Sequence, residues 1–308
     1  MINKQPLVSV IIPTYQRADA LPRAINSALN QDDYENIEVI VVDDNDGYNE
    51  YRKNTERLME QYADNPRVMY IKHPHNMNGA AARNTGERAS KGKYICLLDD
   101  DDIFLPTKIA KQVDYMENHP EFGASYTWRL DKRGNIIGYD KTGDLSSDIL
   151  TLSFFPTTIT LMIRRECYEG INGFDESFRR HQDFEFLLRF FEKYQIGVVQ
   201  EPLSQIIGGA GDAGRLRGKQ FENIKKQFLT TFDKKINEIN IHDPGFKKKV
   251  YAAHYADVFT SHVHSKKYLS AIRVFIVSTV RYSPYYLQEV MKHYKASYNR
   301  RFGGNTTH

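Results

Sequence analysis

The sequence predicts an α/β fold: a mostly parallel sheet flanked by helices, with a helical region at the C-terminal end. Two observations predict it. Over the first hundred residues, short apolar segments rich in β-branched residues alternate with segments of helical spacing. Such alternation builds right-handed βαβ units, whose strands run parallel. From residue 219 to about residue 300 the pattern is helical. The chain of 308 residues has room for one large domain or two modest ones.

Four buried strands are predicted in the first hundred residues, because each is short, apolar and β-branched. They cover 7–13, 37–43, 68–72 and 93–99. Helices are predicted between them over 18–31, 48–63 and 78–90. In sheets of this kind ligands bind at the C-terminal ends of the strands. The residues that follow each strand are therefore the first candidates for a site.

The part of the chain from 106 to 207 does not continue the strand–helix alternation of the first hundred residues. We expect it to cover the sheet edge and hold a second substrate. A helix is predicted to start near Pro106, since proline is tolerated in the first turn. The other elements expected here are a hairpin over 123–140, a strand in 157–167 and an amphipathic helix over 181–194. The next segment, 208–218, has five glycines and is predicted to be a mobile loop.

Composition excludes several classes of protein. Apolar residues make up 41% of the chain and the net charge is +3, as expected for a globular protein. No apolar stretch approaches the ~20 residues of a membrane span, and the N-terminus lacks a signal-peptide pattern. Two isolated cysteines, Cys96 and Cys167, suit a reducing cytoplasm and make no zinc or disulfide pattern. Nucleic acid is not an expected partner, because no motif for it occurs.

Positive charge is concentrated at the C-terminal end of the chain. From His262 onward there are eight lysines and arginines against one acid, Glu289, and aromatic residues are interleaved with them. This asymmetry is typical of two roles. The helices could attach to an anionic membrane surface, or they could pack on the core or against a second copy of the chain. The sequence leaves both open.

Four consecutive carboxylates, Asp99 to Asp102, follow the fourth predicted strand. Like charges side by side repel, so each must be hydrated or neutralised. One interpretation is a solvated turn. The other is a cation site, because Asp99 and Asp101 point the same way on an extended backbone and carboxylates are hard oxygen ligands for Mg²⁺ or Mn²⁺.

Three motifs occur in order between about Leu7 and Arg189: VSVIIPTYQRADALPRAINSALNQDDYENIEVIVVDDNDG, NMNGAAARNTGERASKGKYICLLDDDD and INGFDES followed by HQDFEFLLR. Together they resemble glycosyltransferase family 2. The resemblance implies a Rossmann-like, A-type fold and an inverting, nucleotide-sugar-dependent activity. The expected reaction moves a hexose from a UDP-sugar to an acceptor hydroxyl, in the synthesis of a surface polysaccharide or glycoconjugate.

Matching positions carry the expected donor-side roles. The resemblance implies that Thr14, Tyr15, Asp44, Arg83, Asp99, Asp100, Arg215 and Arg217 contact the nucleotide sugar, and that Asp101 and Asp99 hold Mn²⁺ or Mg²⁺. Asp44 would bind the uracil ring and Arg83 the diphosphate. From the residues alone, the alternative role for Asp44 is a helix N-cap, and that for Arg83 is a structural ion pair.

The resemblance implies that Asp183 is the catalytic base. Gln182 stands where the family's Glu-Asp pair has its glutamate. A helix start favours the ionised carboxylate that a base requires, although plain N-capping is the alternative. The implied acceptor side contains Gly173, Phe174, Asp175, Trp128 and His181. Trp128 could stack on a sugar or pack within the hairpin.

The expected organisation follows from these matches. Residues 1–105 would bind the nucleotide sugar, 106–207 the acceptor, 208–218 would be the mobile loop, and 219–308 the helical region. Expected partners are a glycan or lipid-linked acceptor and a further copy of the chain. The expected location is the cytoplasm, at the inner face of the plasma membrane if the tail binds lipid. Two alternative functions stay open: a sugar-nucleotide-binding protein without turnover, and a metal-dependent nucleotidyltransferase or nuclease.

Overall fold

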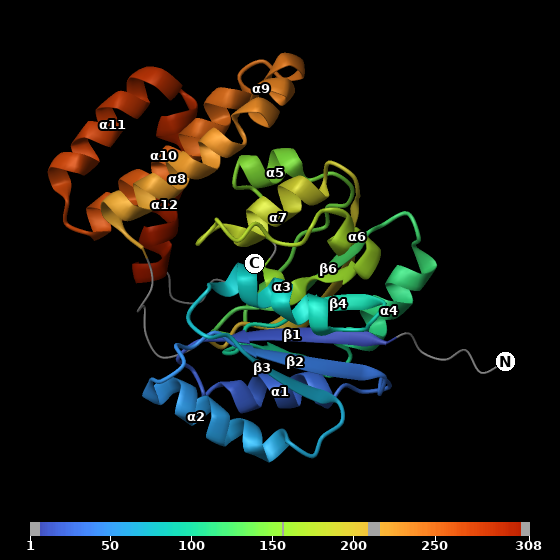
Figure 1. Cartoon of the computed structure of the whole chain (residues 1–308). Helices are drawn as coiled ribbons and strands as arrows, with labels where there is room; N and C mark the ends of the chain where they lie inside the picture. The colour runs from blue at the N-terminus through green and yellow to red at the C-terminus, as the bar shows by residue number, and fades with distance from the viewer. Residues whose placement is uncertain (1–6, 156, 209–215, 303–308) are drawn as a thin grey trace. The chain divides into compact units, whose positions relative to one another are not determined.

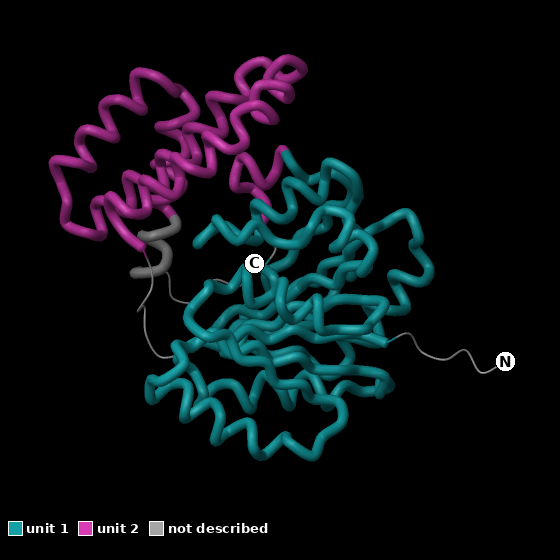
Figure 2. The backbone as a smooth tube through the Cα atoms, in the orientation of Figure 1, with its two compact units in different colours: residues 1–146, 156–211 teal, residues 147–155, 212–308 magenta. Residues whose placement is uncertain are grey.

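The computed structural model describes residues 7–155, 157–208 and 216–302. The chain divides into two compact units (Figure 2). Unit 1 contains residues 1–146 and 156–211, and unit 2 contains 147–155 and 212–308. The sheet belongs to unit 1, whereas unit 2 is helical.

A single mixed sheet forms the centre of unit 1 (Figure 1). Its strands are β1 Val8–Thr14, β2 Ile37–Asp43, β3 Val68–Lys72, β4 Tyr94–Leu97, β5 Ile103–Phe104, β6 Ala124–Leu130, β7 Ile136–Ile137, β8 Met162–Arg164 and β9 Ile196–Gln205. They lie in the order β3-β2-β1-β4-β8-β6-β9-β5, with β7 beside β6. The strands β1 to β4 are parallel, and β8 is antiparallel to both β4 and β6. Strand order reverses at β1, which places a crevice at the carboxyl ends of β1 and its neighbours.

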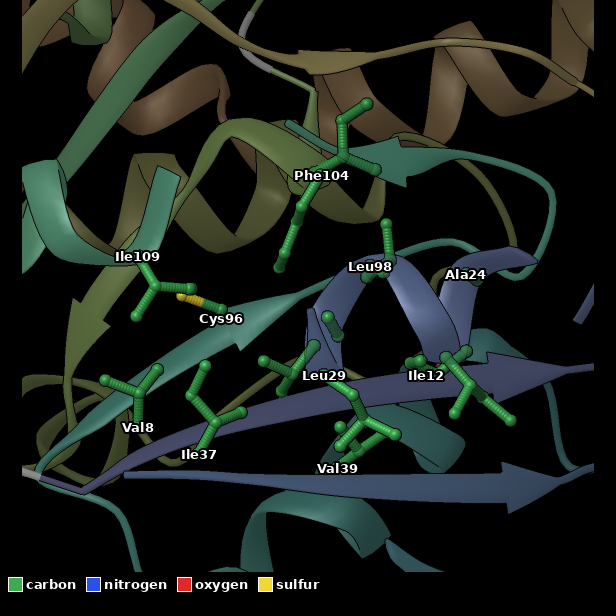
Figure 3. Close-up of a cluster of buried hydrophobic side chains, with 14 of the residues drawn as sticks. Val8, Ile12, Ala24, Leu29, Ile37, Val39, Cys96, Leu98, Phe104 and Ile109 are labelled. Atoms are coloured by element: carbon green, nitrogen blue, oxygen red, sulfur yellow. The ribbon is translucent and has the colours of Figure 1, made fainter. Parts of the chain in front are cut away.

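The helices of unit 1 pack on both faces of this sheet. They are α1 Leu21–Leu29, α2 Glu50–Met59, α3 Gly79–Ala89, α4 Lys108–Asn118, α6 Arg165–Gly170 and α7 Gln182–Phe190, with 3₁₀ turns at Glu60–Tyr62 and Thr158–Thr160. On one face, Val8 and Ile12 of β1 belong to one buried cluster with Leu29 of α1 (Figure 3). On the other, a Cβ at Gly86 of α3 would lie 2.4 Å from Ile11, so this close approach requires glycine.

The α/β fold predicted from the sequence is confirmed, including the four N-terminal strands and the hairpin formed by β6 and β7. The strand expected in 157–167 was too long: a 3₁₀ turn precedes β8, and α6 begins at Arg165. Strand β9 was not predicted. Its sequence contains Pro202, and its pairing with β6 shifts register around Trp128, so the usual alternation is broken.

Unit 2 is a group of helices around α10, as the helical pattern of the C-terminal region predicted. Its elements are α5 Ser146–Leu150, which begins at the boundary with unit 1, α8 Gly218–Thr231, α9 Asp233–His242, α10 Phe246–His264, α11 Tyr268–Tyr282 and α12 Tyr285–Phe302. Helix α10 packs against α8, α9, α11 and α12. Within the described ranges, every helix is too short or too polar to cross a membrane.

Candidate active site

A cleft of about 490 Å³ opens in unit 1 at the carboxyl ends of β1, β2 and β4. It brings together side chains that are far apart in the sequence. Six of the residues predicted to contact the donor line it: Thr14, Tyr15, Asp44, Arg83, Asp99 and Asp100. The first residue of α7, Gln182, lies in the same wall. The crevice at the strand ends is therefore the place where the donor-side candidates meet the start of α7.

Asp44 is buried at the end of β2 and holds the segment that follows β3. Its Oδ1 accepts hydrogen bonds from Nδ1 of His73 at 2.8 Å and from the amide of Met77 at 2.7 Å. Its Oδ2 accepts from the side chain of Asn76 and the amide of Asn78, each at 2.9 Å. Because each oxygen already accepts two hydrogen bonds, a uracil N3–H would have to replace one of them. Asp44 thus shapes the cleft wall, and its contact with the base stays a prediction.

The acidic run after β4 divides between two arginines. Asp99 pairs with an arginine of α3 at 2.7 Å, whereas Asp100 and Asp101 both pair with Nη1 of Arg17, at 3.0 and 2.9 Å. The expected alternation of Asp99 and Asp101 does not hold, because the chain turns and the amide of Asp102 donates to the carbonyl of Asp99. The two carboxylates that face one positive group are therefore Asp100 and Asp101.

Three members of the acidic run, Asp100, Asp101 and Asp102, are buried, and burial raises the pKa values of Asp100 and Asp102. The pKa of Asp100 rises to about 6 and that of Asp102 to about 7. Asp100 accepts a hydrogen bond from the hydroxyl of Thr14 at 2.8 Å. Oδ1 of Asp102 accepts from the amides of Ile207 and Gly208, at 2.9 and 3.1 Å, and so holds the start of the glycine-rich segment.

The convergence of Asp100 and Asp101 fits a divalent cation. Their oxygens approach one point, which the guanidinium nitrogen of Arg17 occupies. Carboxylate oxygens suit Mg²⁺ and Mn²⁺, which commonly bind one or two carboxylates together with substrate phosphates and water. Among the described residues, no cluster of three or more His, Cys, Asp or Glu side chains could hold a metal. Oxygens of the substrate would therefore have to complete the coordination.

Arg83 of α3 connects the acidic run with the start of α7. Its Nη2 pairs with Asp99, and its Nη1 donates to Oε1 of Gln182 at 3.0 Å. Its guanidinium also lies 5.5 Å from the centre of the Phe174 ring. Since Gln182 accepts the hydrogen bond without adding a negative charge, Arg83 remains a strong positive group in the cleft wall.

Asp183 lies beside this arginine in the first turn of α7. Its Oδ1 accepts a hydrogen bond from the amide of Phe184 at 3.0 Å. Burial raises the pKa of Asp183 to about 6; the Phe184 amide and the charge of Arg83 oppose this rise, and the charge of Asp99 adds to it. A carboxyl with this pKa is ionised at neutral pH and still basic enough to accept a proton.

The turn at 173–175 is held by α3. Gly173 has φ +64°, and a Cβ there would lie 2.5 Å from Oδ1 of Asn84. Asn84 accepts from the amide of Phe174 and donates to its carbonyl, both at 2.9 Å. Asp175 accepts a hydrogen bond from the amide of Ser177 at 2.8 Å. The helix that carries Arg83 therefore also fixes the turn assigned to the acceptor side.

Trp128 packs within the hairpin. Its indole nitrogen donates to the carbonyl of Tyr139 at 3.1 Å. A Cβ at Gly138 would lie 2.6 Å from the indole ring, so the ring lies directly against the second half of the hairpin. Of the two interpretations of Trp128, this geometry favours packing over stacking on a sugar.

The remaining candidates lie in different places. His181 precedes α7 with φ +58°, and its ring stacks on that of Phe184 at 5.2 Å. Arg217 is exposed at the start of α8, in unit 2. Arg215 and most of the predicted mobile loop lie outside the described residues. Their expected contact with the donor stays a prediction.

Several residues of this region were not predicted from the sequence. Arg17, Arg179 and Arg180 line the cleft, and Asn84 fixes the acceptor-side turn. Each lies within two residues of a predicted one: Arg17 is two residues after Tyr15, Asn84 follows Arg83, and Arg179 and Arg180 directly precede His181. Local pattern does not distinguish an arginine in a cleft from one on a solvated surface, so adjacency to a motif was the only indication available.

Comparisons of sequence identify the family. The model of Glycosyl transferase family 2 matches residues 9–171. A protein of Methanocaldococcus jannaschii described as an uncharacterized glycosyltransferase is 30% identical over 206 residues, which cover 64% of this chain and 69% of that protein. The Escherichia coli UDP-Glc:alpha-D-GlcNAc-diphosphoundecaprenol beta-1,3-glucosyltransferase WfaP is 34% identical over 132 residues, covering 43% of this chain and half of WfaP.

Comparisons of structure show the same fold. Residues 1–349 of Staphylococcus aureus TarS, in complex with UDP-GlcNAc, match with a TM-score of 0.65 and 17% identity, over 87% of this chain and 79% of that one. The mannosyltransferase PcManGT of Pyrobaculum calidifontis, in complex with GDP-Man and Mn²⁺, matches with a TM-score of 0.57 and 16% identity, over 98% and 89%. Because the family model covers more than half of the sequence, the chain belongs to glycosyl transferase family 2.

Proposed function

We propose that this glycosyltransferase moves a sugar from a UDP-sugar to an acceptor hydroxyl with inversion of configuration. One observation carries the proposal. In a single cleft, Arg83 binds both Asp99, at the end of the donor-side strand, and Gln182, the neighbour of Asp183. The arrangement therefore offers a positive group for a leaving diphosphate beside a carboxylate that can accept a proton.

A uridine nucleotide is the donor that we favour. WfaP is named for UDP-Glc, and the TarS structure contains UDP-GlcNAc, whereas the PcManGT structure contains GDP-Man. In this chain Tyr15 lines the cleft and is 41% exposed, which leaves its ring available to stack on a base. Asp44 would affect binding of the uracil ring chiefly by holding the segment from Asn76 to Asn78 in the cleft wall.

The leaving diphosphate would be stabilised by fixed positive groups. Arg83 lines the cleft, and Arg179 and Arg180 add two further guanidinium groups to its walls. Preorganised charges of this kind stabilise the negative charge that develops as the sugar departs. A divalent cation held by Asp100 and Asp101 would supply further neutralisation of the diphosphate when bound.

Asp183 would accept the proton of the acceptor hydroxyl as that oxygen attacks the anomeric carbon. Its position in the first turn of α7 favours the ionised form, since the helix start is electropositive. A single displacement places the entering and leaving oxygens on opposite sides of the carbon, so the configuration inverts and no covalent nucleophile is needed. The acceptor would be a glycan or a lipid-linked sugar held near the 173–175 turn.

The two buried free cysteines are consistent with a cytoplasmic location.

A screen of nucleotide sugars tests the donor assignment. UDP- and GDP-activated glucose, galactose, N-acetylglucosamine and mannose are incubated with Mn²⁺ and candidate acceptors, and the released nucleotide diphosphate is quantified. We expect release from at least one UDP-sugar at more than about tenfold the rate from any GDP-sugar. Release from GDP-sugars alone would replace the uridine assignment, and tight UDP binding without any turnover would favour a binding protein.

Replacement of Asp44 by asparagine tests the role of the cleft wall. The substitution replaces one carboxylate oxygen by an NH₂ group, which then faces N–H groups that donate hydrogen bonds to Asp44 in the unaltered chain. We expect the free energy of unfolding to fall by about 2–4 kcal/mol. UDP affinity should fall at least tenfold, measured by calorimetry below the unfolding range. Asp46→Asn is the matched control, because Asp46 accepts one exposed hydrogen bond from the Asn76 amide. Equal effects of both substitutions would contradict the assignment.

A further inference from the structure

The outward face of α11 is apolar. Four of its exposed apolar residues share one side of the helix, as their spacing of three and four residues requires. They are Leu269, 86% exposed, Ile272, 55%, Ile276, 57%, and Val280, 82%, and together we name them the outer stripe. The buried residues Ala271, Val274 and Ser278 lie on the opposite side. Helix α11 therefore packs against α10 and α12 through one face and exposes a second, apolar face.

Such a face is unusual for a surface helix. Helices at the surface of a globular protein normally carry polar residues on the side that faces water. A contiguous exposed apolar stripe instead marks a site of interaction with a protein or a membrane. Helix α12 adds Leu287, Met291 and Tyr294, which are 42%, 54% and 65% exposed.

Positive charge accompanies the outer stripe. Arg273 is 56% exposed and lies on the same helix face, and Arg281 follows Val280 directly. Arg281 and Tyr282 line two cavities of about 230 and 540 Å³. The smaller also contains Lys226 and Arg273, which both pair with the buried carboxylate of Glu222 in its wall, and the larger contains Lys247 and Lys248. Cationic cavities beside an apolar stripe provide places for anionic headgroups next to a surface that can enter the acyl boundary.

We propose that α11 docks unit 2 on an anionic membrane surface, with the outer stripe in the interfacial layer and the arginine-lined cavities against lipid phosphates. Charge complementarity selects this partner over a second copy of the chain. Two copies packed through this face would bring Arg281 and the lysines of the two cavities close to those of the other copy, whereas an anionic leaflet neutralises them; Arg273 is already paired with Glu222. From residue 262 onward Glu289 is the only acid in the sequence, and Glu222 of α8, the acid in the wall of the smaller cavity, is outnumbered there by Lys226, Arg273 and Arg281.

Vesicle flotation tests this proposal without any sugar nucleotide, so its outcome is independent of the donor assignment. The full chain is mixed with vesicles of phosphatidylcholine containing 30% phosphatidylglycerol, or of phosphatidylcholine alone. We expect binding to the anionic vesicles to be at least tenfold stronger, and to weaken in 0.5 M NaCl. The double variant Ile272→Glu/Ile276→Glu should lose at least tenfold of this binding, and Arg281→Gln should lose severalfold.

Ile241→Glu is the matched control, because Ile241 is a 73% exposed residue of α9 in the same unit. It should bind anionic vesicles within twofold of the unaltered chain, and circular dichroism should show equal helix content for all variants. Equal flotation of the unaltered chain and the stripe double variant would overturn the proposal. So would a dimer in solution that the stripe variant dissociates while vesicle binding stays unchanged.

Discussion

Asp183→Asn is expected to lower kcat for sugar transfer by about 10²–10⁴-fold while the affinity for UDP changes by less than about twofold. The amide that replaces the carboxylate cannot accept a proton from the attacking hydroxyl. It keeps the size of the side chain, and the donor-side residues Tyr15 and Asp99 are not altered. Steady-state release of the nucleotide diphosphate and calorimetric titration with UDP measure the two quantities separately.

Asp140→Asn is a suitable control, since Asp140 is an exposed carboxylate in the segment that follows β7. It should leave both quantities unchanged. A parallel loss of kcat and of UDP affinity in Asp183→Asn would assign Asp183 to donor binding and remove it as the base.

The pH dependence of transfer gives a second measure of the same carboxyl. The pKa of Asp183 is about 6 and the base must be ionised, so kcat should rise as the pH increases through about 6 and level off above it. Gln182→Glu would add a negative charge beside Asp183 and compete for Arg83. Both effects raise the pKa of Asp183, so the midpoint of the profile should move upward by about half a pH unit or more. An unchanged midpoint would mean that another group controls the profile.

Asp101→Ala is expected to abolish the dependence of UDP binding on Mn²⁺. In the unaltered chain we expect Mn²⁺ to strengthen UDP binding at least tenfold, because Asp100 and Asp101 face one point and diphosphate oxygens can complete the coordination. One carboxylate alone is a weak ligand, so the titrations with and without Mn²⁺ should coincide within about twofold in the variant.

Arg17→Ala should strengthen the binding of Mn²⁺ in the absence of nucleotide. The guanidinium of Arg17 occupies the point on which the two carboxylates converge, and its removal leaves them without that compensating charge. Binding of Mn²⁺ without nucleotide, followed by electron paramagnetic resonance, should become several times tighter. Asp64→Asn, an exposed position before β3, is the control and should match the unaltered chain. For Asp101→Ala, the contradicting result is UDP binding that still strengthens with Mn²⁺ as much as in the unaltered chain. The cation would then bind at a place that does not include Asp101.

The sequence predicted the N-terminal half of the fold well because β1, β2 and β4 are buried on both faces and therefore form continuous apolar runs. The edge strand β3 was also predicted as a buried strand, but it is half-exposed. Strand β9 escaped prediction because Pro202 and polar residues interrupt it, and its existence depends on pairing with β6. The same distinction applies to the site. Motifs located the strand ends, whereas the turn after β4, which separates Asp99 from Asp101, is a matter of tertiary geometry.

The partners of Asn84 show why the rest could not be predicted. Its side chain bonds to Phe174, 90 residues along the chain, and no local pattern records such a contact. Arg17 is similar, since its carboxylate partners lie 83 and 84 residues away. Sequence reasoning found the residue types that the chemistry needs, but pairing between remote segments decided which of them face each other.

The position of Arg83 has a thermodynamic consequence. A single guanidinium contacts both Asp99, on the proposed donor side, and Gln182, the residue that begins α7. A substrate that moved this guanidinium on one side of the cleft would therefore change the electrostatic potential on the other side. Any change in donor affinity caused by a bound acceptor must then be matched by an equal change in acceptor affinity caused by the donor. In the proposed reaction, a donor whose diphosphate draws Arg83 away from Gln182 would change the affinity for the acceptor, and the acceptor would change the affinity for the donor by the same factor.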